Sequence, residues 1–303
     1  MRPCSRSVTV VGSIALDTVE TPWGSSEEGL GGAATYFSLA AAHYAHVHLV
    51  GVVGEDFPHE HVALLESKGI GLEGLERAPG RTFRWTGRYH EDVNQRDTLD
   101  TQLNVFESFH PKLPEAAAQA EYLFLGNIHP SLQAEVLDQS RARFVALDTM
   151  NLWIHTTLDA LKAVLSRVDA VIINDSEVKD LTGEPNLVRG AAAVTGLGPR
   201  VVVVKKGEHG CMLFEGGDVF AIPAFPLAEV VDPTGAGDSF AGGFMGYVAS
   251  QDASDTATLR AAVAHGSAVA SFTCEAFGPD RLAAIGMRDI IERCEAFRAL
   301  TAF

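Results

Sequence analysis

The sequence predicts an α/β protein with a mostly parallel central sheet. From residue 121 onward, strand-like apolar runs alternate with helical ones, a rhythm typical of a parallel sheet with right-handed crossovers. These strand-like runs are 121–125, 143–148, 168–173 and 200–205. Earlier in the chain, residues 81–90 and 97–104 favour β structure on either side of a polar turn, and this hairpin interrupts the rhythm.

Composition favours one large globular domain spanning residues 1–303. Of its residues 47% are hydrophobic and 20% are charged, so the chain can bury a sizeable core. The formal net charge of −16 argues against a nucleic-acid partner, because neutralising phosphates requires clustered Lys and Arg. No apolar run reaches membrane-spanning length and the first residues lack a signal-peptide core, so we expect no membrane partner and a cytoplasmic location. Cys4, Cys211, Cys274 and Cys294 are too widely spread to predict a zinc site or a disulfide framework.

The chain opens with a β-branched strand at residues 7–12, and residues 13–17 lead out of it. By sequence alone Asp17 is a turn acid, which is the commoner role of an aspartate at a strand end. Gly31 and Gly32 predict a tight turn, and the alanine-rich stretch after them predicts a core helix. Residues 47–56 predict a second buried strand followed by a glycine turn, and we expect both to have a structural role.

Residues 69–74 satisfy the spacing G-x-G-x-x-G of a dinucleotide-binding loop. That spacing indicates such a loop only where a strand precedes it and a helix follows it. Here the preceding stretch, 61–68, is helical, so we reject the interpretation together with an NAD-linked enzyme. No G-x-x-x-x-G-K-S/T occurs, which excludes a P-loop.

Three of the predicted strands end in polar residues, and ligands in parallel sheets gather at the carboxyl ends of strands. These ends are 126–129, 148–151 and 174–177. We expect the first two to contact substrate, with Asn127 as the leading candidate. In the third, Asn174 and Glu177 have the spacing of a helix capping box, which is a structural role.

After strand 200–204, a turn combines two lysines with two glycines. Its residues are Lys205, Lys206, Gly207 and Gly210. The glycines would set the turn and a lysine would lie near phosphate, although both lysines also suit a solvated surface. Residues 210–221 then predict a hairpin and 255–272 an amphipathic helix, on which His265 is either an adenine neighbour or a packed core residue.

The stretch 230–240 places a proline turn, two glycines and a carboxylate at the start of a helix. Gly235 and Gly237 let the backbone approach a ligand closely. The amides of residues 235–238, which include Ala236, would lie at a helix N-terminus, where anions bind. Asp238 would repel a phosphate there, which makes sense if it takes a proton from a hydroxyl that attacks phosphorus. The alternative is that Asp238 only caps the helix.

The run D-P-T-G-A-G-D-S-F at 232–240 resembles the signature of the ribokinase, or PfkB, family of carbohydrate kinases. Further motifs follow the family's order, at 12–17, 31–32, 51–56, 174–177 and 205–210. The resemblance implies a ribokinase-like α/β fold, a three-layer sandwich with a mostly parallel central sheet and a small β-sheet lid. It also implies ATP-dependent phosphorylation of a hydroxyl on a sugar, polyol or nucleoside. It implies that Asp238 is the base and that Gly235, Ala236 and Gly237 form the anion hole.

The resemblance also implies roles for residues that have structural interpretations on their own. Asp17 would bind two substrate hydroxyls, and Gly31, Gly32 and Tyr36 would lie where substrate approaches the backbone. Asn174 and Glu177 would serve ATP phosphates and the water ligands of Mg²⁺, and the turn 205–210 would bind the nucleotide. Segments 17–30 and 81–105 would form a lid over the site, which is also the expected surface of a homodimer.

In several relatives K⁺ binds beside the anion hole through residues that map onto Asp232 and Thr234; the alternative is that these two only close a proline turn. Lid arginines 81, 84, 88 and 96 alternate with acidic residues, which favours a neutral acceptor over a sugar phosphate. Ribose itself is disfavoured, since Ala33 and Tyr36 replace residues of the ribokinases proper. A sugar-phosphate kinase and a non-catalytic ligand-binding protein on the same fold remain the alternatives.

Overall fold

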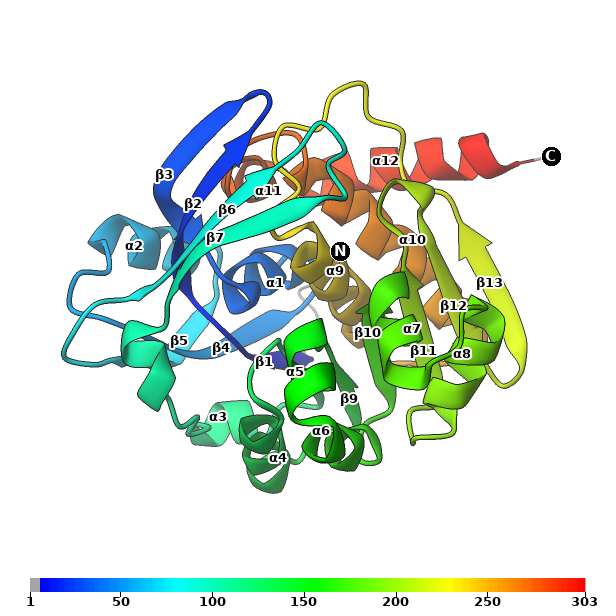
Figure 1. Cartoon of the computed structure of the whole chain (residues 1–303), viewed down its shortest axis with the longest axis horizontal. Coiled ribbons are helices and arrows are strands. Elements are labelled where there is room, and N and C mark those ends of the chain that lie inside the picture. Colours follow the sequence, from blue (N-terminus) through cyan, green and yellow to red (C-terminus); the bar gives the residue numbers. More distant parts are fainter. Residues whose placement is uncertain (1–5, 303) are drawn as a thin grey trace.

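The computed structural model describes residues 6–302 and is organised around a nine-stranded sheet (Figure 1). The strand order is β13-β12-β11-β10-β9-β8-β1-β4-β5. The bounds are β1 (Ser7–Val11), β4 (His46–Val53), β5 (Gly71–Arg77), β8 (Tyr122–Leu125), β9 (Phe144–Leu147), β10 (Ala170–Asn174), β11 (Val201–Lys205), β12 (Cys211–Glu215) and β13 (Asp218–Ile222). From β11 to β5 all neighbours are parallel, and β12 and β13 add an antiparallel hairpin at one edge. The predicted mostly parallel sheet is confirmed.

Central strands such as β11 consist largely of apolar residues because both faces of this sheet are buried. In β11, Val201 and Val203 belong to one core cluster while Val202 and Val204 belong to the other, and all four side chains are fully buried. Alternate side chains of a strand point to opposite faces, so a strand covered on both sides must be apolar throughout.

Helices cover the two faces and complete the predicted three-layer sandwich (Figure 1). One core cluster is shared with α1 (Ala33–Ala41), α2 (His59–Ser67), α9 (Ala236–Gln251), α10 (Thr256–Thr273), α11 (Asp280–Ala284) and α12 (Met287–Thr301). The other is shared with η1 (Asn104–Ser108), α3 (Glu115–Ala118), α4 (Pro130–Gln139), α5 (Asn151–Thr156), α6 (Leu158–Leu165), α7 (Asp175–Thr182) and α8 (Leu187–Thr195). A short η2 (Gly207–His209) lies in the turn after β11.

The glycines of α9 let this helix lie unusually close to its neighbours. A Cβ at Gly242 would collide with the carbonyl oxygen of Phe37 in α1, and one at Gly243 would lie 3.0 Å from Gly266 Cα in α10. Backbone cannot move aside as a flexible side chain can, so these positions require glycine. The start of α9 is consequently fixed against the core.

A smaller separate sheet of order β3-β2-β6-β7 lies at one side of the central sheet (Figure 1). Its strands are β2 (Ala15–Thr21), β3 (Gly24–Gly31), β6 (Phe83–Tyr89) and β7 (Arg96–Gln102). They fall within or beside the two segments predicted to form the lid. Asp17 lies inside β2, opposite Trp85 of β6, and not in the turn that the sequence suggested, because the small sheet extends the chain there.

Strand β5 was not predicted. Residues 69–74 lead into this edge strand, which pairs in parallel with β4, so no helix follows the glycines and the rejected dinucleotide loop is absent from this part of the described chain. Cys4 lies outside the described residues, and Cys211, Cys274 and Cys294 are free thiols. Across residues 6–302, no helix combines the length and apolarity that a membrane span requires.

Candidate active site

The site is built on the first turn of α9. Gly235 precedes the helix with φ of 76°, a left-handed conformation that favours glycine, and a Cβ here would also collide with the ring of Tyr36. The amide of Ala236 donates to the Pro233 carbonyl at 3.1 Å, whereas those of Gly235 and Gly237 make no such bond outside the helix in the described chain. Two amides at a helix N-terminus therefore stay available to an anion.

Lys205, at the end of β11, lies over this helix start. Its Nζ is 3.3 Å from Oδ2 of Asp148 at the end of β9, and a Cβ at Gly237 would lie 3.0 Å from the same Nζ. Burial alone would lower the pKa of Lys205, but the charges of Asp148, Glu177 and Asp238 raise it. The lysine thus stays protonated among three carboxylates.

Asp238 has the properties of a base that works near neutral pH. Burial raises the pKa of its carboxyl from 3.8 to about 7, the charge of Asp148 raises it further, and Lys205 opposes the rise. Proton transfer is most efficient when the pKa of the base lies near the working pH.

Asp17 faces the same region from the small sheet. A Cβ at Gly31 would collide with its carboxylate, and the amide of Gly32 donates to it. Burial raises the pKa of Asp17 to about 7 against the Gly32 hydrogen bond, and the charges of Asp232 and Asp238 add to the rise. The structure therefore brings together Asp17, Gly31 and Gly32. Tyr36 lies beneath them, only 2% exposed and packed under Gly235, so it supports the site from below.

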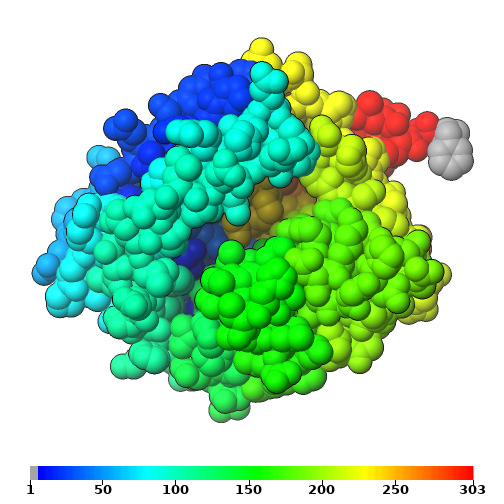
Figure 2. Space-filling view, in the orientation of Figure 1, coloured from blue at the N-terminus to red at the C-terminus, as the bar shows by residue number. Residues whose placement is uncertain are grey.

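Asn127, at the end of β8, accepts a hydrogen bond from Nε1 of Trp153 in α5 at 2.8 Å. Figure 2 shows a hollow between α5 and the small sheet, with α9 visible at its base. Asn127 therefore contacts α5, the helix that borders this hollow.

Asn174 and Glu177 form the capping box that their spacing predicts. Asn174 Oδ1 accepts from the Glu177 amide and Glu177 Oε2 accepts from the Asn174 amide, both at 2.8 Å. Yet Glu177 is also a buried carboxylate beside the site: burial raises its pKa to about 7, and the charge of Asp148 adds to the rise. Glu177 thus both caps α7 and places a carboxyl group beside the site.

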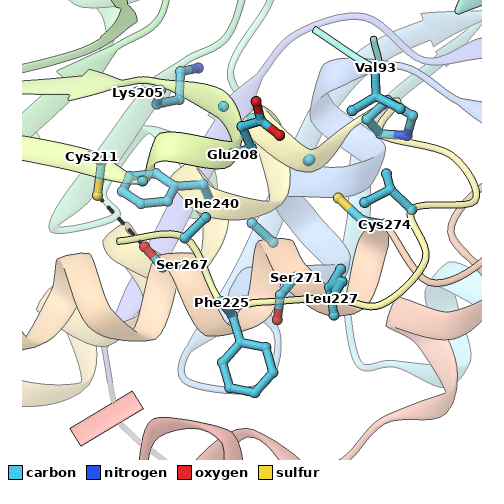
Figure 3. A pocket seen from close by; sticks show the side chains of 18 of the residues that line it. Val93, Lys205, Glu208, Cys211, Phe225, Leu227, Phe240, Ser267, Ser271 and Cys274 are labelled. Carbon is cyan, nitrogen blue, oxygen red and sulfur yellow. Dashed lines mark hydrogen bonds between the residues drawn. The ribbon is translucent and has the colours of Figure 1, made fainter. Parts of the chain in front are cut away.

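A cavity of about 580 Å³ opens beside Lys205 and the start of α9 (Figure 3). Lys205, Gly207 and Gly210 line it from the turn that the sequence analysis singled out, and Ala236 and Gly237 line it from α9. Away from Lys205 the lining includes Phe225 and Leu227 (Figure 3), and Val230 and Phe240 add further apolar surface. A volume of this size with charge at one end and apolar walls at the other suits a nucleotide.

Two predicted nucleotide residues do not line this cavity. Lys206 is absent from the described lining. His265 accepts or donates a 3.1 Å hydrogen bond with the Tyr44 hydroxyl and stacks on Tyr247 at 4.1 Å. Burial lowers the pKa of His265 to about 4, so it is a neutral, packed side chain. This geometry matches the core interpretation of His265.

Asp232 is a buried carboxylate, 1% exposed, without a cationic side chain within ion-pair distance in the described chain. Its oxygens accept from the amides of Thr234 (2.8 Å) and Gly278 (3.2 Å). The Val231 amide donates to the Cys274 carbonyl at 2.8 Å, so segments 231–234 and 274–278 lie side by side. Burial raises the pKa of Asp232.

The sequence analysis missed several residues that the site contains. Asp148 was included only in a polar strand end expected to meet substrate, whereas it lies with Lys205 and Glu177 on the nucleotide side. The cavity wall at 224–230 and 267–274 carries no polar motif. Tyr89 of β6, whose hydroxyl accepts from Thr234 Oγ1 at 3.3 Å, gave no signal because strand tyrosines are common.

A buried carboxylate at a helix N-terminus, a buried lysine and an adjoining nucleotide-sized cavity are the features expected of a phosphotransferase that acts on a hydroxyl. A family model described as "pfkB family carbohydrate kinase" matches residues 6–283, and the chain belongs to this family. Kinases of this family use ATP and Mg²⁺ in general and bind small-molecule substrates.

The relatives named below cover most of this chain. A cytidine kinase of Thermococcus kodakarensis is 32% identical over 79% of this chain and 88% of its own. A nucleoside kinase of Methanothermobacter thermautotrophicus is 28% identical (81% and 78%), and an inositol 3-kinase of Arabidopsis thaliana is 25% identical (90% and 75%). The crystal structure of a Methanocaldococcus jannaschii nucleoside kinase superposes with a TM-score of 0.79 at 19% identity over 97% and 99% of the two chains, which shows the shared fold.

Replacing the proposed base should abolish turnover without loss of the fold. We expect Asp238→Asn to lower kcat by about 10²–10⁴-fold, the usual contribution of a general base, while ATP still binds. Steady-state kinetics and ATP titration measure the two effects. Asp159→Asn, an acid in the first turn of α6, is the matched control and should leave kcat unchanged. Near-normal turnover of Asp238→Asn would show that another group is the base.

The same variant gives a pH test. Since Asp238 must be unprotonated to act, wild-type kcat/KM should fall below about pH 7. A carboxyl whose pKa rises from 3.8 to about 7 on folding costs stability progressively as the pH rises through that range. Asp238→Asn should therefore have a higher Tm than wild type, by a margin that grows from pH 4 to pH 7 and then stays constant. A margin independent of pH would contradict the raised pKa.

Proposed function

We propose that the protein transfers the γ-phosphoryl group of ATP to a hydroxyl of a nucleoside, with Asp238 as the base. The observation that carries this proposal is the position of Asp238 on the first turn of α9. It directly follows Ala236 and Gly237, which line the nucleotide-sized cavity, and it is close enough to Asp17 for its charge to raise the pKa of that carboxyl. ATP would place its base in the apolar end of the cavity and its phosphates at the turn of Lys205.

The reaction follows from these positions. Asp238 takes the proton of the acceptor hydroxyl, whose oxygen forms a bond to the γ-phosphorus. The bond between that phosphorus and the β–γ bridging oxygen breaks, and ADP leaves with the electron pair. The amides of Gly235 and Gly237 and the ammonium of Lys205 stabilise the negative charge that develops.

A nucleoside is the favoured acceptor because two relatives that each match about four fifths of this chain, at 32% and 28% identity, are named as cytidine and nucleoside kinases. Asp17, with Gly31 and Gly32, would hold the ribose hydroxyls, as a buried carboxylate suits a diol. The inositol 3-kinase relative supports a second candidate, a cyclitol, which would present hydroxyls to the same aspartate.

A panel of acceptors tests the proposal through ADP release and product analysis. Cytidine, uridine, adenosine, inosine, ribose and myo-inositol are compared at equal concentration. We expect the best nucleoside to exceed ribose and myo-inositol in kcat/KM by at least 100-fold. Its 2′-deoxy analogue should react more slowly, because a site that binds a hydroxyl leaves its own polar group unpaired without it. Preference for myo-inositol would establish the cyclitol candidate, and no acceptor-dependent ADP release would refute kinase activity.

Glu177 and Asp148 have the chemistry to hold Mg²⁺, because they are buried carboxylates beside Lys205, near the phosphate end of the cavity. Gln133 Oε1 and Thr149 Oγ1 nearby are buried without hydrogen-bond partners, so further oxygen donors surround the site. Hard oxygen ligands suit Mg²⁺. When bound, the ion neutralises phosphate charge.

Glu177→Gln should raise the Mg²⁺ concentration required for half-maximal activity, since it removes a negative charge near the ion. Magnesium titrations of initial rate measure this shift, with thermal denaturation alongside. Asp289→Asn is the control, because Asp289 Oδ2 accepts the Gly286 amide at the start of α12 at 2.8 Å, the same contact away from the site. An unchanged Mg²⁺ requirement with a lower Tm would leave Glu177 with its capping role alone.

We also propose that K⁺ binds beside Asp232 and Thr234 and orders the anion hole. Support comes from the buried, uncompensated charge of Asp232 and from the backbone of 274–278 beside it. The assay compares K⁺ with tetramethylammonium at constant ionic strength. We expect a several-fold loss of rate that added K⁺ restores, and equal rates in the two salts would refute the site. A homodimer through the small sheet and a cytoplasmic location also stay predictions.

A further inference from the structure

The hairpin of β6 and β7 reaches from the small sheet to the nucleotide cavity and to the loop that precedes the anion hole. At its tip, Asn94 contacts Gly207, where a Cβ would collide with the asparagine amide, and Val93 and Asn94 both line the cavity (Figure 3). Below the tip, the Tyr89 hydroxyl accepts from Thr234 Oγ1 at 3.3 Å. The hairpin therefore rests on the nucleotide turn and on the loop that precedes the anion hole.

The arginines at positions 81, 84, 88 and 96, in the small sheet or just before β6, differ in their carboxylate partners. Arg84 pairs with Glu28 at 2.7 Å and with Asp56 at 2.8 Å, and Arg88 pairs with Glu20 at 2.7 Å. Arg81 has Asp56 at 3.9 Å. Arg96, in contrast, has no carboxylate within ion-pair distance in residues 6–302, and its guanidinium is exposed and lies over the Trp85 ring at 5.1 Å from the centroid.

Arg96 is placed to face the reaction centre. It pairs in register with Tyr89, the residue that touches Thr234. Burial raises the pKa values of Asp17, Glu177 and Asp238 to about 7, and the positive charge of Arg96 opposes the rise in all three. These carboxylates come from β2, α7 and α9, so Arg96 lies close enough for its charge to reach groups on three separate elements. The charge of Lys205 acts on two of the same carboxylates, Glu177 and Asp238.

We propose that Arg96 is a catalytic residue that binds the γ-phosphoryl group during its transfer, as the hairpin closes over the site. This proposal rests on the proposed kinase activity. As the acceptor oxygen bonds to phosphorus and the bridging bond to ADP breaks, negative charge spreads over the three non-bridging oxygens. A guanidinium offers paired N–H donors that match two such oxygens, and it stays protonated throughout.

The position explains why Arg96 lacks a carboxylate partner. A cation already paired would lose that partner before it could bind phosphate, whereas Arg96 is held by its strand, by the Trp85 face and by a hydrogen bond with the neutral Tyr89 hydroxyl. Lys205 is tied to Asp148 and so supplies a fixed charge at one side of the phosphates. Arg96 supplies a second charge from the hairpin, so the hairpin contributes a group of its own to the site.

The test compares wild type, Arg96→Ala, Arg96→Lys and the control Arg88→Ala, which removes an arginine of the same hairpin that is paired with Glu20. Wild-type turnover with the best acceptor is measured first, and its absence would refute the kinase activity itself. Given that activity, Arg96→Ala should lower kcat by about 10²-fold or more with little change in either KM. Arg96→Lys should recover part of the loss, and Arg88→Ala should behave as wild type.

Two further readouts separate catalysis from support of the hairpin. Guanidinium ion at millimolar concentrations should restore part of the rate to Arg96→Ala and none to Arg88→Ala. ADP with aluminium fluoride and acceptor, a mimic of the transferring group, should bind wild type more tightly than ADP with acceptor does, and Arg96→Ala should lose this gain while binding ADP normally. A kcat within threefold of wild type, a loss confined to the KM of the acceptor, or an undiminished gain from aluminium fluoride would overturn the proposal.

Discussion

Carboxylates gathered around one lysine determine how this site behaves. Asp148, Glu177 and Asp238 raise the pKa of Lys205, and their own ionisation is made difficult by burial and by one another. In a low-dielectric site such repulsion is strong, and only added positive charge relieves it. Acidic side chains therefore outnumber the lysine at this site. A nucleotide that arrives with its metal ion brings both the phosphates and the charge that lets the acids ionise.

This electrostatic arrangement depends on packing elsewhere. Gly242 and Gly243 allow α1 and α10 to approach α9 at backbone distance, so its first turn cannot drift relative to the sheet. Tyr36 under Gly235 fixes the turn from below. Preorganised dipoles stabilise developing charge because they need no reorientation during the reaction. The close packing that the glycines of α9 allow therefore holds the amide dipoles at its start in place.

Much of the site could be predicted because it lies in short, contiguous runs. The stretch 232–240 contains turn, amides and base, and the alternation of strands predicts which ends meet. Residues that act across the fold left no comparable trace. No sequence motif marks Asp148 or Arg96 as a neighbour of Lys205 and Asp238. Only the folded chain brings the end of β9 and the start of β7 close to them. Strand β5 was missed because its glycines resemble a loop, and pairing with β4 overrides that local preference.

The contact between the hairpin tip and Gly207 links events that a chemical scheme treats separately. Val93 and Asn94 lie against the nucleotide cavity, while Tyr89 of the same hairpin touches the loop leading to the anion hole. One element thus contacts both the nucleotide cavity and the approach to the anion hole. Each ligand that orders the hairpin reduces the conformational entropy that the other must lose, so the affinities of donor and acceptor are thermodynamically coupled.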